Sequence, residues 1–164
     1  MTDVFDVRTR SRVMAAIGSK DTGPELIVRT FLHKRGFRFR LHIKELAGRP
    51  DIVLPRHKVA LFVHGCFWHQ HDGCALAAVP ASNKEFWKKK LNGNRIRDLD
   101  RVSKLGLMGW RVGIFWECAV RKGTVHVGTL KALEKWLTQT SNFKEFPASP
   151  LRKKRAIYRR SRIR

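Results

Sequence analysis

Residues 58–65 (KVALFVHG) form a nearly unbroken apolar run, and this run constrains the fold more than any other segment of the chain. Strands of this composition are buried on both faces, because helices cover both sides of their sheet. The run leads into residues 63–74 (VHGCFWHQHDGC), which combine histidines, cysteines and two large aromatic residues. The sequence therefore predicts a central strand. The segment that follows it is a metal site, a catalytic site, a surface that binds a flat group, or a crowded part of the core.

Other segments complete an α/β pattern. A capping-box pattern at Thr22 and Glu25 begins a helix, and Gly36 ends it. Hydrophobic periodicity then predicts strands at 37–43, 48–54 and 110–118, two helical pieces within 83–107 separated around 92–94, and a last helix at 127–139. We expect a central mixed sheet flanked by helices.

Composition indicates a single domain that binds nucleic acid. The 164 residues include 35 Lys and Arg against 13 Asp and Glu, a net charge of +22. A charge of this size indicates a polyanionic partner, and nucleic acid is the commonest one. The aromatic residues and the patterned apolar interior argue against a ribosomal or membrane-surface protein. Because the chain has no apolar run of about 18 residues and no apolar signal segment, we expect a cytoplasmic protein without a membrane span.

Three cysteines and a histidine have the spacing of a metal site. Cys66, His71 and Cys74 follow a C-x4-H-x2-C pattern, and Cys118 lies at the end of a predicted strand. Together they make a Cys₃His set, a closed class of structural zinc site that leaves no open position for chemistry. On spacing alone His69 could replace His71, and three buried thiols are the alternative to a metal. We favour structural zinc.

Candidates for hydrolytic chemistry lie close to these residues. Asp51 follows a turn at the entrance of a predicted strand, where a carboxylate can hold Mg²⁺ or can simply satisfy the turn. His64 and His69 have no assigned metal, and a neutral imidazole can act as a general base toward water. Asp98 could orient such an imidazole, or it could pair with a neighbouring arginine on a solvated helix face.

Large aromatic residues lie among basic ones. Phe67 and Trp68 fall inside the predicted zinc loop, and Trp87 lies in the basic segment EFWKKK. Apolar side chains on a basic surface can wedge between base steps and kink a duplex, although burial in the core is the usual fate of tryptophan. A metal site next to them would hold such a wedge rigid, so we favour the wedge.

Taken together, these motifs resemble the very short patch repair (Vsr) family of DNA mismatch endonucleases. The resemblance extends over roughly residues 3–138, in order and with near-family spacing. The segments that carry it are TRSRVMAAI (9–17), the helix start at Asp21-Thr22 and Glu25, GRPD (48–51), HGCFWHxH (64–71), Cys74, Phe86-Trp87, Asn94 to Asp98, and WRV…WEC (110–118).

The resemblance implies a restriction-endonuclease-like fold and a Mg²⁺-dependent enzyme that nicks one DNA strand 5′ to the thymine of a T:G mismatch. Such mismatches arise when 5-methylcytosine deaminates, so a functional link to a cytosine-5 DNA methyltransferase follows. We expect a monomer associated with the bacterial nucleoid. Residues 1–20 would form a DNA-contacting arm, residues 21–140 the catalytic domain, and residues 141–164 a basic, disordered tail.

The resemblance also implies a role for each candidate residue. The catalytic set would be Asp51, His69 as general base, Asp98 as its support, Glu25 near the metal-bound waters, and His64. The Mg²⁺ ligands would be Asp51 and the backbone carbonyl of Val63. The zinc ligands would be Cys66, His71, Cys74 and Cys118. The side chains inserted beside the mismatch would be Phe67, Trp68 and Trp87 from the major groove, and Met14 and Ile17 from the minor groove.

The chain departs from the family pattern at two places. Val63 stands where the family commonly has threonine, and two residues, Asp72-Gly73, separate His71 from Cys74 where some relatives have one. Because valine also supplies a backbone carbonyl, we expect activity to survive. The alternatives are a non-catalytic mismatch-binding module and a restriction-type endonuclease that cuts matched DNA.

Overall fold

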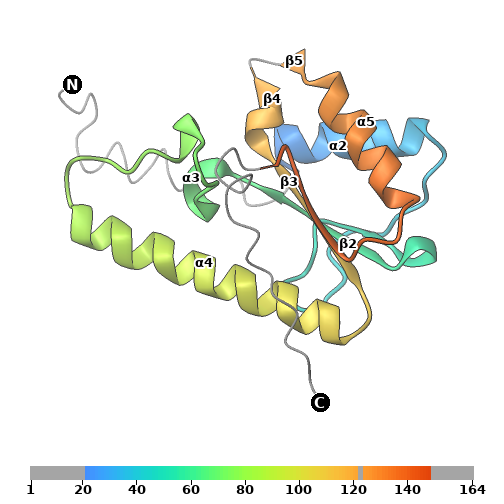
Figure 1. The fold of residues 1–164 in the computed structure, drawn as a ribbon, viewed down its shortest axis with the longest axis horizontal. Helices are drawn as coiled ribbons and strands as arrows, with labels where there is room; N and C mark the ends of the chain where they lie inside the picture. The colour runs from blue at the N-terminus through green and yellow to red at the C-terminus, as the bar shows by residue number, and fades with distance from the viewer. Residues whose placement is uncertain (1–20, 122–123, 149–164) are drawn as a thin grey trace.

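The computed structural model describes residues 21–121 and 124–148, in which four strands form one mixed sheet (Figure 1). The strands run in the order β1-β2-β3-β6. Their bounds are Ile52–Leu54 for β1, Val59–His64 for β2, Arg111–Trp116 for β3 and Phe143–Phe146 for β6. β1 is antiparallel to β2, whereas β2, β3 and β6 are parallel to one another. The expected mixed sheet with a central strand at 58–65 is confirmed.

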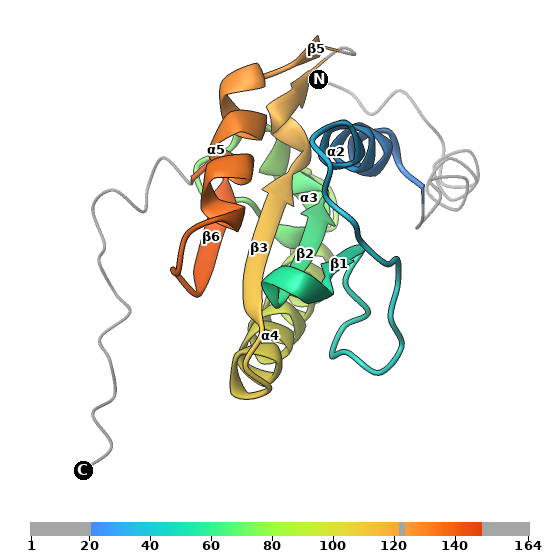
Figure 2. The same ribbon diagram turned by 90° about the vertical axis from the view of Figure 1, so that its right-hand side faces the viewer.

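Helices cover both faces of this sheet (Figure 2). On one face, Leu61 of β2 and Phe115 of β3 pack with α2 (Gly23–Lys34) and α5 (Val127–Leu137). On the other face, Phe62 and Val112 pack against Leu105 of α4 (Lys84–Leu107). Because successive strand residues point to opposite faces, the continuous apolar run of β2 fills both layers of the core.

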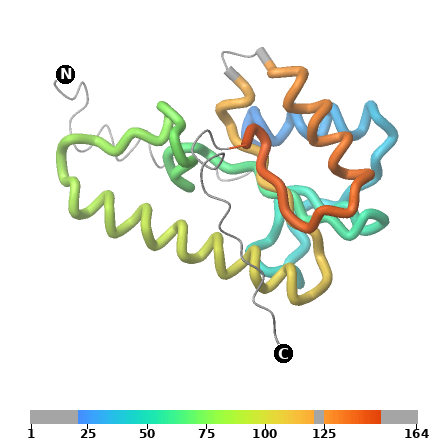
Figure 3. The backbone as a smooth tube through the Cα atoms, viewed as in Figure 1, coloured from blue at the N-terminus to red at the C-terminus, as the bar shows by residue number. Residues whose placement is uncertain are grey.

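The remaining elements are short and lie near the carboxyl ends of the strands. Residues Cys66–His69 form the single turn α3, directly after β2, and residues Val120–Arg121 and Thr124–Val125 pair as β4 and β5. Figure 3 shows α3 and the first turns of α4 beyond the end of β2, away from the body of the sheet. No helix within the described residues is both long and apolar enough to span a membrane.

The strand predicted at 37–43 is wrong. Only Arg40 pairs with β1, through two backbone hydrogen bonds of 2.8 Å to Val53. His42 has φ of 48°, a left-handed conformation that ends any extended run. Phe37 and Phe39 pack on the α2 side of the sheet, whereas Ile43 packs on the α4 side. The alternating pattern of residues 37–43 therefore belongs to a loop and not to a strand. Its apolar side chains pack on two different faces of the sheet.

The break predicted around residues 92–94 is also wrong, since α4 is continuous from Lys84 to Leu107. A glycine such as Gly93 costs a helix interior about 1 kcal/mol, which packing can outweigh. Trp87 and Leu91 are buried before this point and Leu105 after it. Packing of these buried residues, before and after Gly93, therefore keeps α4 helical across a segment of low helix propensity.

The beginning of the segment assigned to the tail belongs to the sheet. Residues 143–146 form β6, which pairs with β3 from Val112 to Phe115. Phe146 is buried, and its ring centroid lies 5.6 Å from that of Trp136. The described sheet therefore extends past residue 140, and residues 149–164 lie outside the described residues.

Candidate functional site

The candidate site forms where β2 and β3 end side by side. Their parallel register pairs His64 with Trp116, so the segments that follow the two strands begin next to each other. Glu117, after β3, accepts a hydrogen bond of 2.6 Å from the backbone N–H of Cys66 at the start of α3. Gly65 has no side chain, and a Cβ at this position would lie only 3.3 Å from the Trp68 ring, closer than an ordinary van der Waals contact. This junction fixes the direction in which α3 leaves the sheet.

His69, at the end of α3, is held by a carboxylate from α4. Its Nδ1 lies 2.6 Å from Oδ2 of Asp98, whose other oxygen accepts a bond of 3.2 Å from Arg101. Burial alone would raise the pKa of Asp98, but the hydrogen bond and charge of His69 outweigh it and hold that pKa below its ordinary value. With its proton on Nδ1, the imidazole presents Nε2 as a free acceptor, which is the arrangement a general base requires.

His64 lies against His69 but in a different environment. The two rings stack with centroids 3.7 Å apart and an interplanar angle of 10°. Burial, with a smaller contribution from His69, lowers the pKa of His64 to about 3, so it is neutral at physiological pH. Its Nδ1 is buried without a hydrogen-bond partner among the described residues. Of the two histidines, His69 therefore has the geometry of a base, and His64 supports its ring.

Asp51 contacts β2 at Val63, the residue before His64. Its Oδ2 accepts a hydrogen bond of 2.7 Å from the backbone N–H of Val63. Within a strand, the N–H and C=O of one residue point to the same side, so the carbonyl of Val63 faces the Asp51 edge as well. Burial above all, followed by the charge of Glu25, raises the pKa of Asp51 to about 6. A carboxylate whose negative charge is this unfavourable is a suitable ligand for a cation.

Glu25 occupies a buried position on α2 close to this carboxylate. It accepts hydrogen bonds from Arg29 Nη2 at 2.7 Å, from the hydroxyl of Thr22 at 2.9 Å and from the backbone of Asp21 at 3.2 Å. The carboxylate of Asp51 and the carbonyl of Val63 therefore offer two oxygen ligands in one place, with the Glu25 carboxylate close enough to raise the pKa of Asp51. Hard divalent cations such as Mg²⁺ prefer oxygen ligands, so these residues fit one.

The three cysteines and His71 come together behind α3. The four ligand atoms lie within 4.8 Å of one another, and His71 Nδ1 is 3.7 Å from the sulfur of Cys66 and 3.4 Å from that of Cys118. Tetrahedral zinc, with Zn–S of about 2.3 Å and Zn–N of about 2.0–2.1 Å, separates sulfur and nitrogen by about 3.5–3.6 Å. The hydrogen bond between the two thiols lowers the pKa of Cys118 and, together with burial, raises that of Cys66, so one proton is held between the two sulfurs. The cluster therefore has the ligand types and the spacing that a structural metal requires.

The aromatic residues form one cluster at the junction of α3 and α4. The Phe67 ring centroid lies 5.1 Å from that of Trp68 and 5.3 Å from that of Trp87. Trp87 is only 8 % exposed, whereas its neighbour Phe86 is 57 % exposed, and Lys90 lies over the rings of Trp68 and Phe86. In this structure Trp87 supports the cluster from below, and Phe86 protrudes.

Three supporting residues were not identified as site residues from the sequence: Asn94, Arg101 and Glu117. Asn94 donates a hydrogen bond of 2.9 Å to the backbone carbonyl of Trp68, which ties the aromatic turn to α4. The signal was present, because Asn94 and Glu117 belong to the N-x3-D and WEC motifs. Met14 and Ile17 lie outside the described residues.

The chain is similar in sequence to known proteins over most of its length. The family model "DNA mismatch endonuclease Vsr" matches residues 2–75. The DNA mismatch endonuclease Vsr of Escherichia coli K12 is 42 % identical over 139 residues, which cover 84 % of this chain and 88 % of that protein. The type II nicking enzyme V.XorIIP of Xanthomonas oryzae is 47 % identical over 118 residues, covering 72 % and 86 %. V.NmeAIP of Neisseria meningitidis, also a type II nicking enzyme, is 42 % identical over 125 residues, covering 76 % and 89 %.

Proposed function

The chain belongs to the Vsr family of DNA mismatch endonucleases, and we propose that it nicks one strand of duplex DNA 5′ to the thymine of a T:G mismatch. The observation that carries the proposal is the pair of contacts on β2: Val63 with Asp51, and His64 with His69. Through these contacts a half-buried carboxylate and an oriented imidazole lie beside Val63 and His64, two neighbouring residues of β2. Hydrolysis of a phosphodiester needs both a base for water and stabilisation of the developing charge.

In this mechanism His69 accepts a proton from the attacking water through Nε2, while Asp98 stabilises the imidazolium that forms. Asp51 and the backbone carbonyl of Val63 would hold Mg²⁺, and Glu25 would lie near the waters bound to that ion. When bound, Mg²⁺ supplies Lewis-acid stabilisation of the phosphoryl and leaving oxygens. The products would be a 5′-phosphate and a 3′-hydroxyl.

The Cys₃His cluster would hold one Zn²⁺ through Cys66, His71, Cys74 and Cys118. Since four protein ligands leave no open position, this ion would be structural. It would connect the turn that carries His69 to the end of β3. Phe67 and Trp68 would then enter the duplex beside the mismatch from a rigid base, with Trp87 packed against both rings.

The same proposal covers the surroundings of the enzyme. We place it as a monomer in the bacterial cytoplasm at the nucleoid, with a restriction-endonuclease-like domain, a DNA-contacting arm at residues 1–20 and a basic tail. It would act on the deamination products of a cytosine-5 DNA methyltransferase. The net charge of +22 supports association with DNA.

A nicking assay on T:G, T:A and C:G duplexes, with and without Mg²⁺, tests the proposal. We expect Mg²⁺-dependent nicking of one strand of the T:G duplex only. Equal rates on matched duplexes would instead identify a restriction-type enzyme. Tight T:G binding without cleavage of any duplex would identify a mismatch-binding module.

A further inference from the structure

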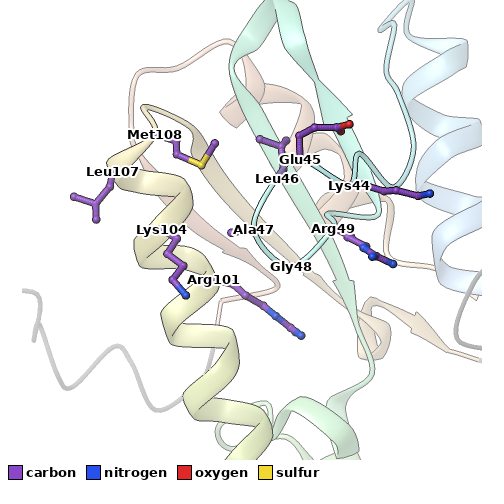
Figure 4. Close-up of a pocket in the computed structure, with 10 residues that line it drawn as sticks. All are labelled: Lys44, Glu45, Leu46, Ala47, Gly48, Arg49, Arg101, Lys104, Leu107 and Met108. Atoms are coloured by element: carbon purple, nitrogen blue, oxygen red, sulfur yellow. The ribbon is translucent and has the colours of Figure 1, made fainter.

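We propose that a basic groove between residues 44–49 and the last turns of α4 binds phosphates of the nicked strand, about two to three nucleotides 5′ of the scissile phosphate. The proposal rests on the proposed function, because it takes the position of the nick from it. The groove has a volume of about 740 Å³ and opens on the α4 side of the molecule (Figure 4). It lies outside the set of residues assigned to catalysis or to the wedge.

The lining of the groove has the charge that a phosphate backbone requires. Lys44 and Arg49 lie on one wall, Arg101 and Lys104 on the other, and Glu45 is the acidic residue among those that line it. Figure 4 shows the Arg101 side chain extending from α4 toward the side of the loop at Gly48, and the Lys44 and Arg49 side chains extending from that loop away from α4. Lys104 also contacts Asp100 at 2.7 Å, an exposed pair that a phosphate can replace at little cost.

The groove is continuous with the candidate active site. Arg101 donates to Asp98, the carboxylate that orients His69, and Arg49 precedes Asp51 by two residues. Gly48 has φ of 77°, and a Cβ there would lie 2.6 Å from the side chain of Arg101. The loop therefore closes directly on Arg101 and fixes the near end of the groove beside the reacting phosphate.

The position along α4 sets the distance and the direction. Lys104 follows Asp98 by six residues, which is about 9 Å of helix. In the proposed binding mode α4 runs along the duplex axis, and at an axial rise of about 3.4 Å per nucleotide this distance corresponds to two to three phosphates. Trp87 precedes Asp98 on the same helix, so the aromatic cluster and the groove lie on opposite sides of the active site. The mismatched thymine is 3′ of the proposed nick, so the aromatic cluster lies on the 3′ side of the scissile phosphate. The groove, on the opposite side of the active site, therefore receives the part of the strand that is 5′ of the nick.

The test combines protein and DNA substitutions. The double variant Lys44→Ala/Lys104→Ala removes two exposed cations that have no catalytic role. Its matched control, Lys131→Ala/Lys135→Ala, removes two exposed lysines from α5 on the opposite face of the sheet. T:G duplexes carry a neutral methylphosphonate at one position at a time, one to four nucleotides 5′ of the nick, and Kd is measured against salt without Mg²⁺.

We expect the slope of log K against log salt to become shallower by about 1.8 in the double variant, as the loss of two phosphate contacts requires. The control should keep the wild-type slope, and both variants should nick saturating DNA at rates within about twofold of wild type. Neutralising the second or third phosphate should weaken wild type more than the double variant, which keeps only Arg49 and Arg101 in the groove. An unchanged slope, or a methylphosphonate effect that is undiminished in the double variant or moves to the complementary strand, would refute the groove assignment. The binding outcomes are independent of the nicking result, because binding is measured without cleavage.

Discussion

His69 and His71 are two residues apart, yet they belong to clusters of opposite character. The His69 side chain is 25 % exposed, and its Nδ1 is bonded to a carboxylate. His71 is 2 % exposed, points Nδ1 at two sulfurs and stacks on Trp116 with centroids 4.3 Å apart. Gln70 between them has φ of 51°, and this left-handed residue turns the chain from one cluster to the other.

Under the proposed function, environment and not residue type separates the reactive His69 from the structural His71. A carboxylate on one nitrogen leaves the other free to act on a substrate, and partial exposure lets the substrate reach it. Soft ligands around a buried nitrogen leave neither access nor an open metal position. Substitutions at the two positions should therefore give different phenotypes.

The largest effect is expected for His69→Ala. Loss of the general base should lower the nicking rate by about 10²- to 10⁴-fold, whereas affinity for T:G duplex and zinc content should stay near wild type. Single-turnover nicking and fluorescence anisotropy measure the two properties. If the variant loses binding together with nicking, His69 is a structural residue and the contrast with His71 disappears.

A smaller effect is expected for Asp98→Asn. The amide can still meet His69, but it no longer stabilises the imidazolium or selects its tautomer, so we expect a loss of about 10- to 100-fold, part of what a general base contributes. Zinc content and mismatch affinity serve as controls. A wild-type rate would show that the 2.6 Å contact only anchors α4 to α3.

For His71→Ala we expect the loss of zinc and a decrease of about tenfold in nicking, because the turn that carries His69 loses its attachment to β3. Elemental analysis and Tm measure the first effect, and single-turnover kinetics the second. His71→Cys is the matched control, since Cys₄ is also a structural zinc set and should restore the metal and the rate. Full zinc content in the alanine variant would contradict the ligand assignment.

The smallest effect concerns the stability of the protein without Mg²⁺. Since burial raises the pKa of Asp51 to about 6, the folded state holds this proton more tightly than the unfolded chain, and stability falls as pH rises from about 4 to about 6. Asp51→Asn removes the charge but keeps an oxygen for the Val63 amide. We expect its Tm at pH 8 to exceed that of wild type by about 2–8 °C, with a smaller difference at pH 5. A lower Tm at pH 8 would contradict this account.

The sequence predicted best those features that depend on residue type. The apolar runs predicted β2 and β3, and three cysteines with one histidine predicted a cluster that the fold assembles from positions as distant as Cys66 and Cys118. Features that depend on tertiary packing were not predicted. Trp87 is buried because Phe67 and Trp68 fold over it, and α4 continues through Gly93 because buried residues hold it on both sides. The orienting contact from Asn94 to Trp68 also requires the fold.

The hydrogen bond from the Val63 amide to Asp51 limits what a substitution at position 63 can change. Every residue except proline carries a backbone N–H, so another residue that β2 accommodates opposite Phe115 of β3 can make the same contact. The Val63 side chain packs against the core on the α2 side of the sheet, so a replacement must also fit that space. Position 63 therefore carries two separate requirements: its main chain holds the carboxylate, and its side chain fills the core.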